Sequence, residues 1–341
     1  MPRKPASTEH RTMYGMFKVI SLATLCFVLG NGCDKKAENP VGANLPEVTL
    51  QLNWKPEPQF GGFYAAEVEG VFRRHGLDVT ITAGGAGAPT VEMIGAGTVA
   101  FAIVSGDEII RARAKGNRVV ALFAVFQTNP QAIMTRASRG LKTLADLLRS
   151  EGILAIERGL PYSDFLERKY GFDSLKIVPS PFGDLSLYRT QVKYAMQCFV
   201  TSEPLAARAM GIEPQTFLIA ESGYNPYTTV LATSEAYLKA NPKIVGALLE
   251  AVRAGWKSYL DDPTKTNQHM NKLNPTMDAR TFEESAAAQQ PLIDTDITSQ
   301  MGLGAMTRER WETLIKQLLD LEVIEKTVDA REVFVNIAAA K

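Results

Sequence analysis

The stretch that decides the fold is NWKPEPQFGGFYAAEVEG, residues 53–70. The segment before it, VTLQLNW, alternates apolar and polar residues and predicts a strand that ends at Asn53 and Trp54. The stretch then passes through two prolines and a Gly-Gly pair into a run typical of a helix. A connection that only turned the chain would not need an indole, a carboxylate, an amide and aromatic rings. We therefore interpret it as one wall of a binding site.

Strand and helix patterns alternate strictly from this stretch onward, which is typical of a parallel α/β sheet. The alternation continues to about residue 229, and residues 234–341 are almost entirely helical in pattern. Within the second half of the alternation, LSLYRTQVKYA (residues 185–195) is predicted to be a helix. Two α/β blocks followed by a helical tail indicate two lobes with the ligand between them.

The bulk composition excludes little but points away from nucleic acid. The chain has 341 residues, of which 45% are hydrophobic and 22% are charged, as in soluble globular proteins. Lysine and arginine together number 37, and aspartate and glutamate together also number 37. A surface that follows phosphates needs a basic excess, so the partner is expected to be a small molecule or another protein.

The N-terminus has the three parts of an export signal. A basic region is followed by the apolar run VISLATLCFVLG and then by NGC, residues 31–33. We expect residues 1–32 to be the signal peptide, Cys33 to be lipidated as in bacterial lipoproteins, and residues 33–46 to form a polar tether. The protein would then be exported and held to a membrane by its lipid. The alternative is a soluble secreted protein.

Polar and aromatic side chains gather just after several predicted strands. In such sheets the ligand lies beyond the carboxyl ends of the strands, so these side chains would line one site. Aromatic rings stack on flat ligands, while amides, hydroxyls and carboxylates bind their edges; the alternative for each ring is a place in the core. The candidate ligand-binding residues are Asn53, Trp54, Glu57, Gln59, Phe60, Tyr64, Ser105, Asp107, Tyr162, Ser163, Glu203, Tyr224, Asn225 and Tyr227.

Local helix chemistry offers a second interpretation of some of these residues. Ser105 and Asp107 lie in SGDE at a predicted helix start, where serine and acidic residues are favoured as caps. Both roles stay open for them. The sequence TAGGAGAPT (residues 82–90) is interpreted as a tight turn, because it lacks the spacing of a phosphate-binding loop. There is no His-x-x-x-His, Cys-x-x-Cys or nucleophile elbow, so we expect no metal site, no catalytic residues and no cofactor.

Three segments carry a family resemblance: LNWKPEPQFGGFYAAEVEGVFRRHGLDVTI, SGDEIIRARAKG and QCFVTSEPLAARAMGI. Together they resemble bacterial substrate-binding proteins of ABC importers, in the branch that groups sulfonate and nitrate binders with binders of thiamine-pyrimidine precursors and with thiamine pyrimidine synthases. The resemblance spans about residues 47–260. It implies the type II periplasmic-binding fold, with lobe I at 47–127 and 230–341, lobe II at 128–229, two crossovers between them, and closure around the ligand.

The resemblance leaves a choice of ligands. It implies a monomer that works with a permease and an ATPase, and candidate residues that are aromatic and acidic favour a flat, amine-bearing ring such as a hydroxymethyl- or formylaminopyrimidine. The alternatives are another flat heterocycle such as riboflavin, or sulfonate or nitrate. The rival from another class is a synthase that uses pyridoxal phosphate and iron. The family often has histidine near Phe60, and this departure leaves the ligand open.

Overall fold

The computed structural model describes residues 45–337, which all belong to one compact unit, Ala43–Lys341. The predicted signal peptide, Cys33 and nearly all of the tether lie outside the described residues. Within residues 45–337, no helix has both the length and the apolar character needed to span a bilayer.

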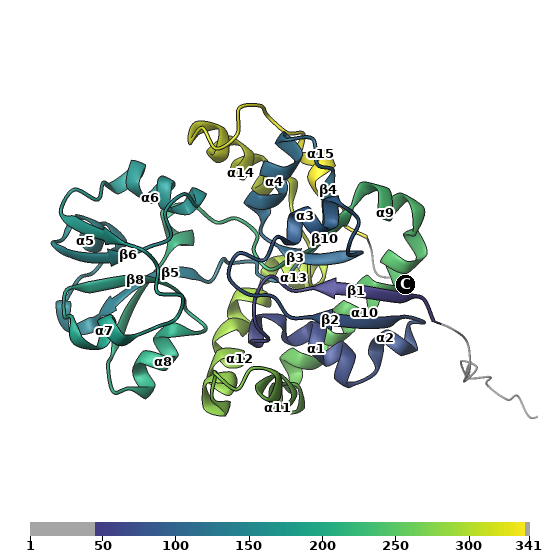
Figure 1. Ribbon diagram of the computed structural model, residues 1–341, viewed down its shortest axis with the longest axis horizontal. Helices are drawn as coiled ribbons and strands as arrows, with labels where there is room; N and C mark the ends of the chain where they lie inside the picture. Colours follow the sequence, from purple (N-terminus) through teal and green to yellow (C-terminus); the bar gives the residue numbers. More distant parts are fainter. Residues whose placement is uncertain (1–44, 338–341) are drawn as a thin grey trace, which may run out of the picture. The chain divides into compact units, whose positions relative to one another are not determined.

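The first sheet contains the strand that begins the described chain. Its order is β2-β1-β3-β10-β4, with β1, β2 and β3 parallel and β10 antiparallel to both of its neighbours (Figure 1). The two strands β3 and β4 are buried along their whole length, as expected for strands covered on both faces. The strands are β1 (Glu47–Gln51), β2 (Asp78–Thr82), β3 (Phe101–Val104), β4 (Val119–Ala124) and β10 (Val230–Ser234).

The second sheet is built from the middle of the chain. Its order is β7-β6-β8-β5-β9, with β6 parallel to β7 and β8, and β5 antiparallel to β8 and β9. Its strands are β5 (Gln131–Arg136), β6 (Gly152–Ala155), β7 (Leu175–Val178), β8 (Tyr194–Phe199) and β9 (Pro214–Leu218).

The prediction of parallel strands is confirmed for β1, β2 and β3 and for β6, β7 and β8, but it is wrong for β5 and β10. The reason lies in the two connections between the sheets. Residues 125–130 join β4 to β5 without a helix, so β5 enters the second sheet against the direction of its neighbours. The chain then returns to the first sheet, where β10 runs antiparallel to both of its neighbours. The predicted helix over 185–195 is also too long, because Tyr194 and Ala195 are buried in β8.

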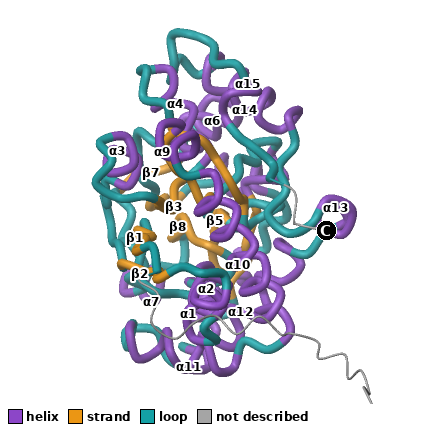
Figure 2. Tube along the Cα trace, turned by 90° about the vertical axis from the view of Figure 1, so that its right-hand side faces the viewer, coloured by secondary structure: helices purple, strands orange, loops and turns teal. Residues whose placement is uncertain are grey.

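Helices surround the strands, as Figure 2 shows. In the first part of the chain they are η1 (Pro58–Phe60), α1 (Gly61–Val68), α2 (Val71–Arg74), α3 (Thr90–Gly95) and α4 (Gly106–Ala114). In the middle part they are η2 (Ala137–Arg139), α5 (Leu144–Arg149), α6 (Pro161–Tyr170), α7 (Ser186–Thr190), α8 (Glu203–Ala209) and η3 (Ile219–Ser222).

The helical tail that the sequence predicted is confirmed in the described part of the chain. It consists of α9 (Glu235–Ala240), α10 (Pro242–Asp261), α11 (Thr264–Leu273), α12 (Ala279–Ile293), α13 (Asp296–Met301), α14 (Arg308–Asp320) and α15 (Ala330–Val333). Most of the tail packs on the first sheet, and α12 also contacts α8 beside the second sheet (Figure 1). The tail is therefore placed to hold the first sheet and to touch the second.

Two glycines bring α1 and α10 into close contact. A methyl group built on Gly255 would lie 2.2 Å from the carbonyl oxygen of Gly62, and one built on Gly62 would lie 2.2 Å from the Trp256 ring. The Gly-Gly pair lets α10 approach α1, because the fully buried rings of Trp256 and Tyr259 occupy the space that side chains at these positions would need. This contact fixes α1, the helix in the second half of the stretch 53–70.

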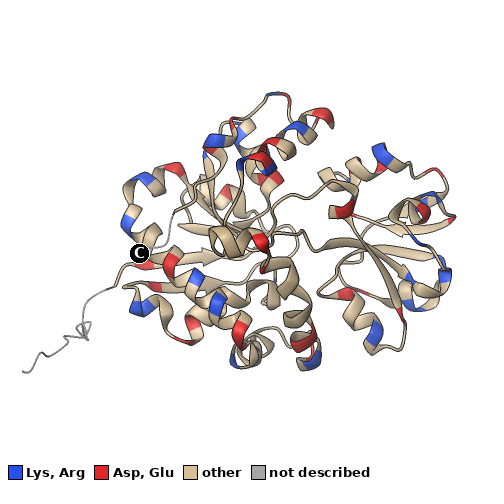
Figure 3. Ribbon diagram, turned by 180° about the vertical axis from the view of Figure 1, so that it is seen from behind, with Lys and Arg blue, Asp and Glu red and all other residues tan. Residues whose placement is uncertain are grey.

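Charges of both signs are interspersed over the ribbon, as Figure 3 shows. This distribution agrees with the equal numbers of basic and acidic residues in the chain. In this view, residues 45–337 show no extended basic stripe of the kind that follows a nucleic-acid backbone.

Candidate ligand-binding site

The connection that leaves β1 is held in one conformation by its neighbours. The Trp54 carbonyl accepts a hydrogen bond from the Gly84 N–H, at 2.9 Å. From the helical tail, Asn274 donates to the carbonyl of Pro56 at 3.1 Å, and Gln289 donates to the carbonyl of Pro58 at 2.8 Å. The partly buried Trp54 side chain is thereby presented from a rigid support. The segment TAGGAGAPT contains the expected turn, at Ala86 and Gly87, and Gly84 of this segment packs on the connection.

Trp54 and Glu57 form a hydrogen-bonded pair at the centre of this connection. The indole N–H of Trp54 donates to Oε1 of Glu57 at 3.0 Å. Burial first, and then the negative charge of Glu203, raise the pKa of Glu57 to about 7, against the lowering effects of the indole hydrogen bond and of Lys55. At neutral pH this carboxyl is therefore close to half protonated.

Glu57 and Glu203 come from the two halves of the fold and lie close enough for the charge of Glu203 to raise the pKa of Glu57. We call these two residues the acid pair. Glu57 follows β1 of the first sheet, whereas Glu203 begins α8 beside the second sheet. Burial raises the pKa of Glu203 too, and the Phe199 N–H, 2.9 Å from its Oε2, opposes that rise. Within residues 45–337 no lysine, arginine or histidine forms an ion pair with either carboxylate. Two desolvated acids that share a site favour a ligand that donates hydrogen bonds or carries positive charge.

A second polar cluster adjoins Glu203 on the second sheet. The Tyr162 hydroxyl donates to Oε1 of Gln197, which also accepts from the Glu157 N–H at 2.6 Å. Next in the chain is Cys198, whose buried thiol has its pKa raised by burial and by the charge of Glu203. The sequence pattern indicated Tyr162 but not Gln197, because an amide inside a strand pattern gives no local sign of its partners.

Tyr224 belongs to a separate group. Its buried ring packs on Phe165, with 5.1 Å between ring centroids, and its pKa is raised by burial and then by the charge of Asp107. Asp107, a predicted site residue, thus lies near Tyr224 rather than at the acid pair. The Ser163 hydroxyl is fully buried and has no hydrogen-bond partner among the described residues.

Two aromatic residues among the predicted site residues pack in the core of the first sheet. Phe60 is fully buried in the core of the first sheet, so the expectation that it contacts ligand is corrected. Tyr64 is also buried there, with its ring 5.9 Å from that of His269.

Gln59 is buried in η1, and Asn53 is partly exposed at the end of β1. Ser105 caps α4, since its N–H and hydroxyl donate to Glu108 at 2.8 and 3.0 Å.

Asn225 and Tyr227 lie in the return connection, where a buried arginine occupies both of them. Arg310 of α14 donates to the carbonyl of Asn225 at 2.7 Å, to its Oδ1 at 3.0 Å and to the carbonyl of Pro226 at 3.1 Å. It also donates to the carbonyl of Gln127 in the other connection. Its guanidinium lies 3.8 Å from the centroid of the Tyr227 ring. Arg310 therefore ties both connections together, a role that no motif in the sequence signalled.

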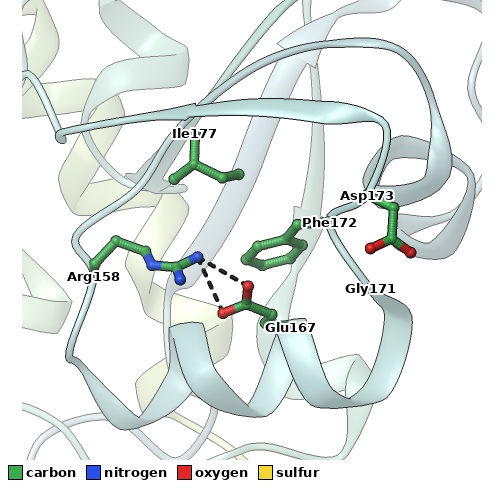
Figure 4. Close-up of a pocket in the computed structure, with 6 residues that line it drawn as sticks. All are labelled: Arg158, Glu167, Gly171, Phe172, Asp173 and Ile177. Atoms are coloured by element: carbon green, nitrogen blue, oxygen red, sulfur yellow. Dashed lines mark hydrogen bonds and ion pairs between the residues drawn. The ribbon is translucent and has the colours of Figure 1, made fainter.

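A cavity lies away from these residues. It has a volume of about 560 Å³ and is bounded by α6, β7 and the segment after β6 (Figure 4). An ion pair between Arg158 and Glu167, 3.0 Å apart, crosses its wall. None of the predicted site residues lines it. Among the described residues there is also no cluster of three His, Cys, Asp or Glu side chains suited to a metal ion.

Comparison with known proteins identifies the family to which the chain belongs. The NMT1/THI5-like family model matches residues 57–266, and the chain belongs to that family. The riboflavin-binding protein RibY of Chloroflexus aurantiacus is 22% identical over 94% of this chain and 97% of its own. A formylaminopyrimidine-binding protein of Halalkalibacterium halodurans is also 22% identical, over 94% of this chain and 98% of its own.

A solved structure confirms the predicted fold class. The alkanesulfonate-binding protein SsuA of Xanthomonas axonopodis pv. citri, bound to MOPS, superposes with a TM-score of 0.64. The match covers 86% of this chain and 100% of that protein, at 13% identity. This similarity establishes the periplasmic-binding fold, with its two α/β parts and helical C-terminal region.

The raised pKa of Glu57 predicts a pH dependence of stability. The folded state binds more protons than the unfolded state between pH 4.5 and about 7, so the contribution is present below pH 4.5 and is lost as the pH rises through 7. Glu57→Gln removes it. Between pH 5 and 8 we expect the wild type to lose roughly 2 to 3 kcal/mol of unfolding free energy relative to this variant. Urea titrations at both pH values measure the difference, and parallel pH profiles would contradict the prediction.

Proposed function

We propose that this chain is an extracytoplasmic solute-binding protein that delivers a thiamine-precursor pyrimidine, of the hydroxymethyl or formylamino type, to an ABC importer. The observation that carries the proposal is the group formed by Trp54, Glu57 and Glu203, in which the indole bonds one partly buried carboxyl and the charge of a second, from the other half of the fold, acts on it. Membership of the NMT1/THI5-like family and the formylaminopyrimidine-binding relative support it.

The chemistry of this group suits an aminopyrimidine. The ring offers a flat face to the Trp54 indole, and its exocyclic amine donates to a carboxylate. A carboxyl with a pKa of about 7 also serves a ring nitrogen, because it donates when protonated and accepts when ionised. Sulfonate and nitrate would instead bring a negative charge toward Glu57 and Glu203, which repel it. The acid pair therefore favours the pyrimidine over the anions.

Riboflavin is the second candidate, since RibY is similar along nearly the whole chain. Its ring system would also stack on an indole, but its edge carries carbonyl acceptors in place of the amine of an aminopyrimidine. A protonated Glu57 can donate to one of those carbonyls, but Glu203 in its ionised form only accepts, so the other carbonyl would lack a donor. We therefore place riboflavin second, and calorimetric titration of the wild type with both compounds separates them.

A synthase is the alternative from another class, and Cys198 bears on it. A cysteine acts as a nucleophile or metal ligand in its thiolate form. Burial and the nearby charge of Glu203 raise the pKa of Cys198 and hold it as a thiol. At Phe60, where the family often has histidine, a buried ring packs in the core. Both observations favour binding over catalysis.

Replacing one member of the acid pair tests the ligand class. Glu203→Gln keeps the shape and an oxygen for the Phe199 N–H but loses the charge. We expect the dissociation constant of 4-amino-5-hydroxymethyl-2-methylpyrimidine to rise roughly tenfold or more, because hydrogen bonds to charged groups are the stronger ones. An analogue without the amine should respond much less. Glu213→Gln, at an exposed glutamate paired with Arg208, is the matched control. Equal responses of the two compounds would contradict an amine at Glu203.

We also propose that the sheets form two lobes, 47–127 with 230–341 and 128–229, that close on the ligand as a monomer. The relative orientation of open and closed lobes would depend on the two connections that Arg310 bridges. Permease and ATPase subunits would receive the ligand, as in other importers of this class.

We also propose that the protein is held to a membrane by a lipid. Cys33 follows an apolar run and a glycine, the pattern at which lipoproteins are processed, so we propose that it carries the lipid anchor. Cys33→Ser should move the protein from the membrane fraction to the soluble fraction of cells that express the full chain. Retention of this variant in the membrane would remove the anchor from the proposal.

A further inference from the structure

The turn between β7 and α7 places a large aromatic side chain where backbone sterics disfavour it. The Asp184 N–H donates to the carbonyl of Pro181 at 3.1 Å, and the two central residues, Phe182 and Gly183, have φ values of 48° and 93°. Turns with two positive φ values are dominated by Gly, Asn and Asp. Phenylalanine at the first central position is therefore unfavourable for the fold.

Packing does not explain the presence of Phe182. Its side chain is 55% exposed, whereas the residues that anchor the turn, Ser180 and Leu185, are 8% and 5% exposed. The turn is therefore held at both ends, and its aromatic tip stands in solvent. A strained backbone together with an exposed ring points to a role outside the stability of the fold.

The turn lies beside Glu203, which indicates a role for Phe182 in ligand binding. A methyl group built on Gly183 would lie 3.9 Å from Oε1 of Glu203, the oxygen that the Phe199 N–H does not use. Phe182 is the adjacent residue, with its Cα about 3.8 Å from that of Gly183. The aromatic tip is thus within side-chain reach of a ring that binds at the acid pair, from the side of the second sheet.

We propose that Phe182 forms an aromatic wall of the ligand site, stacking on the heterocycle that Glu203 binds and so selecting flat rings. This inference rests on the proposed function. Trp54 comes from the first sheet and Phe182 from the second, so the two rings would contact the ligand from different lobes. The strained turn orients the side chain toward the ligand at a cost to the fold.

The proposal makes an unusual prediction for Phe182→Gly. Glycine relieves the strain at φ 48°, so the urea midpoint of unfolding should stay the same or rise. The dissociation constant of 4-amino-5-hydroxymethyl-2-methylpyrimidine should nevertheless rise roughly fivefold or more, because an aromatic contact is lost. Phe182→Tyr keeps the ring and should bind within about twofold of the wild type. Val192→Ser, at a residue that is 54% exposed just after α7, is the control for removing exposed apolar surface.

The outcomes separate this inference from the proposed function. If the wild type binds the pyrimidine and Phe182→Gly binds it equally well, Phe182 is no part of the site and the inference fails alone. A lower urea midpoint with unchanged affinity would assign Phe182 to the fold and also overturn it. If the wild type binds neither the pyrimidine nor riboflavin, the proposed function fails and the inference falls with it.

Discussion

Trp54→Ala weakens binding of the aminopyrimidine by about 2–4 kcal/mol, the range for removing an aromatic anchor from the centre of a binding site. Two losses combine in this variant. The ligand loses the face on which it stacks, and Glu57 loses the indole N–H that lowers its pKa. The carboxyl is then protonated more often at neutral pH, so it accepts less well from an amine. Isothermal titration calorimetry at pH 7 measures the change.

Trp54→Phe separates the two contributions. Phenylalanine keeps an aromatic face but has no N–H for Glu57, so its affinity should lie between those of the wild type and the alanine variant. Because Trp54 is only partly buried, the unfolding free energy should fall less than the binding free energy. An unchanged affinity in Trp54→Ala would remove the indole from the site.

Arg310→Met lowers the unfolding free energy by about 3 kcal/mol, because it leaves several buried acceptors without their donor. These are the carbonyls of Gln127, Asn225 and Pro226, together with the side-chain oxygen of Asn225. Burial lowers the pKa of Arg310 to about 10, so the guanidinium remains charged at neutral pH. Urea unfolding at pH 7 gives the loss directly.

Arg308→Met is the matched control for this variant, two residues earlier in the chain. Arg308 is exposed and forms an ion pair with Glu312 at 2.7 Å, one turn along the same helix. Exposed pairs of this kind contribute about 0.3–0.5 kcal/mol. Equal losses in the two variants would show that Arg310 does not join the connections in solution.

Much of the fold was predictable because its signals are local. The alternation in VTLQLNW, the apolar runs of β3 and β4 and the spacing in α10 and α14 each specify an element without reference to distant residues. Strand direction was not predictable in this way. The reversed entries of β5 and β10 follow from connections between sheets, which a pattern of strands and helices does not encode.

The candidate site could be proposed from the sequence where residues follow a strand end and not where they depend on packing. Trp54, Glu57 and Glu203 stay predicted site residues, and the structure places Trp54 beside Glu57 and Glu57 within the influence of the charge of Glu203. Phe60 was misplaced, because the short turn of η1 directs it inward under α12, and the sequence does not show that direction. Arg310 lies far along the chain from both segments it binds, so only the folded chain reveals it.

Mass spectrometry of the small molecule released on unfolding the exported, natively purified protein tests the central claim most directly. We predict an aminopyrimidine, present at close to one molecule per chain and absent from preparations of Trp54→Ala. A sulfonate, or pyridoxal phosphate together with iron, would contradict the account, and riboflavin would assign the site to the second candidate.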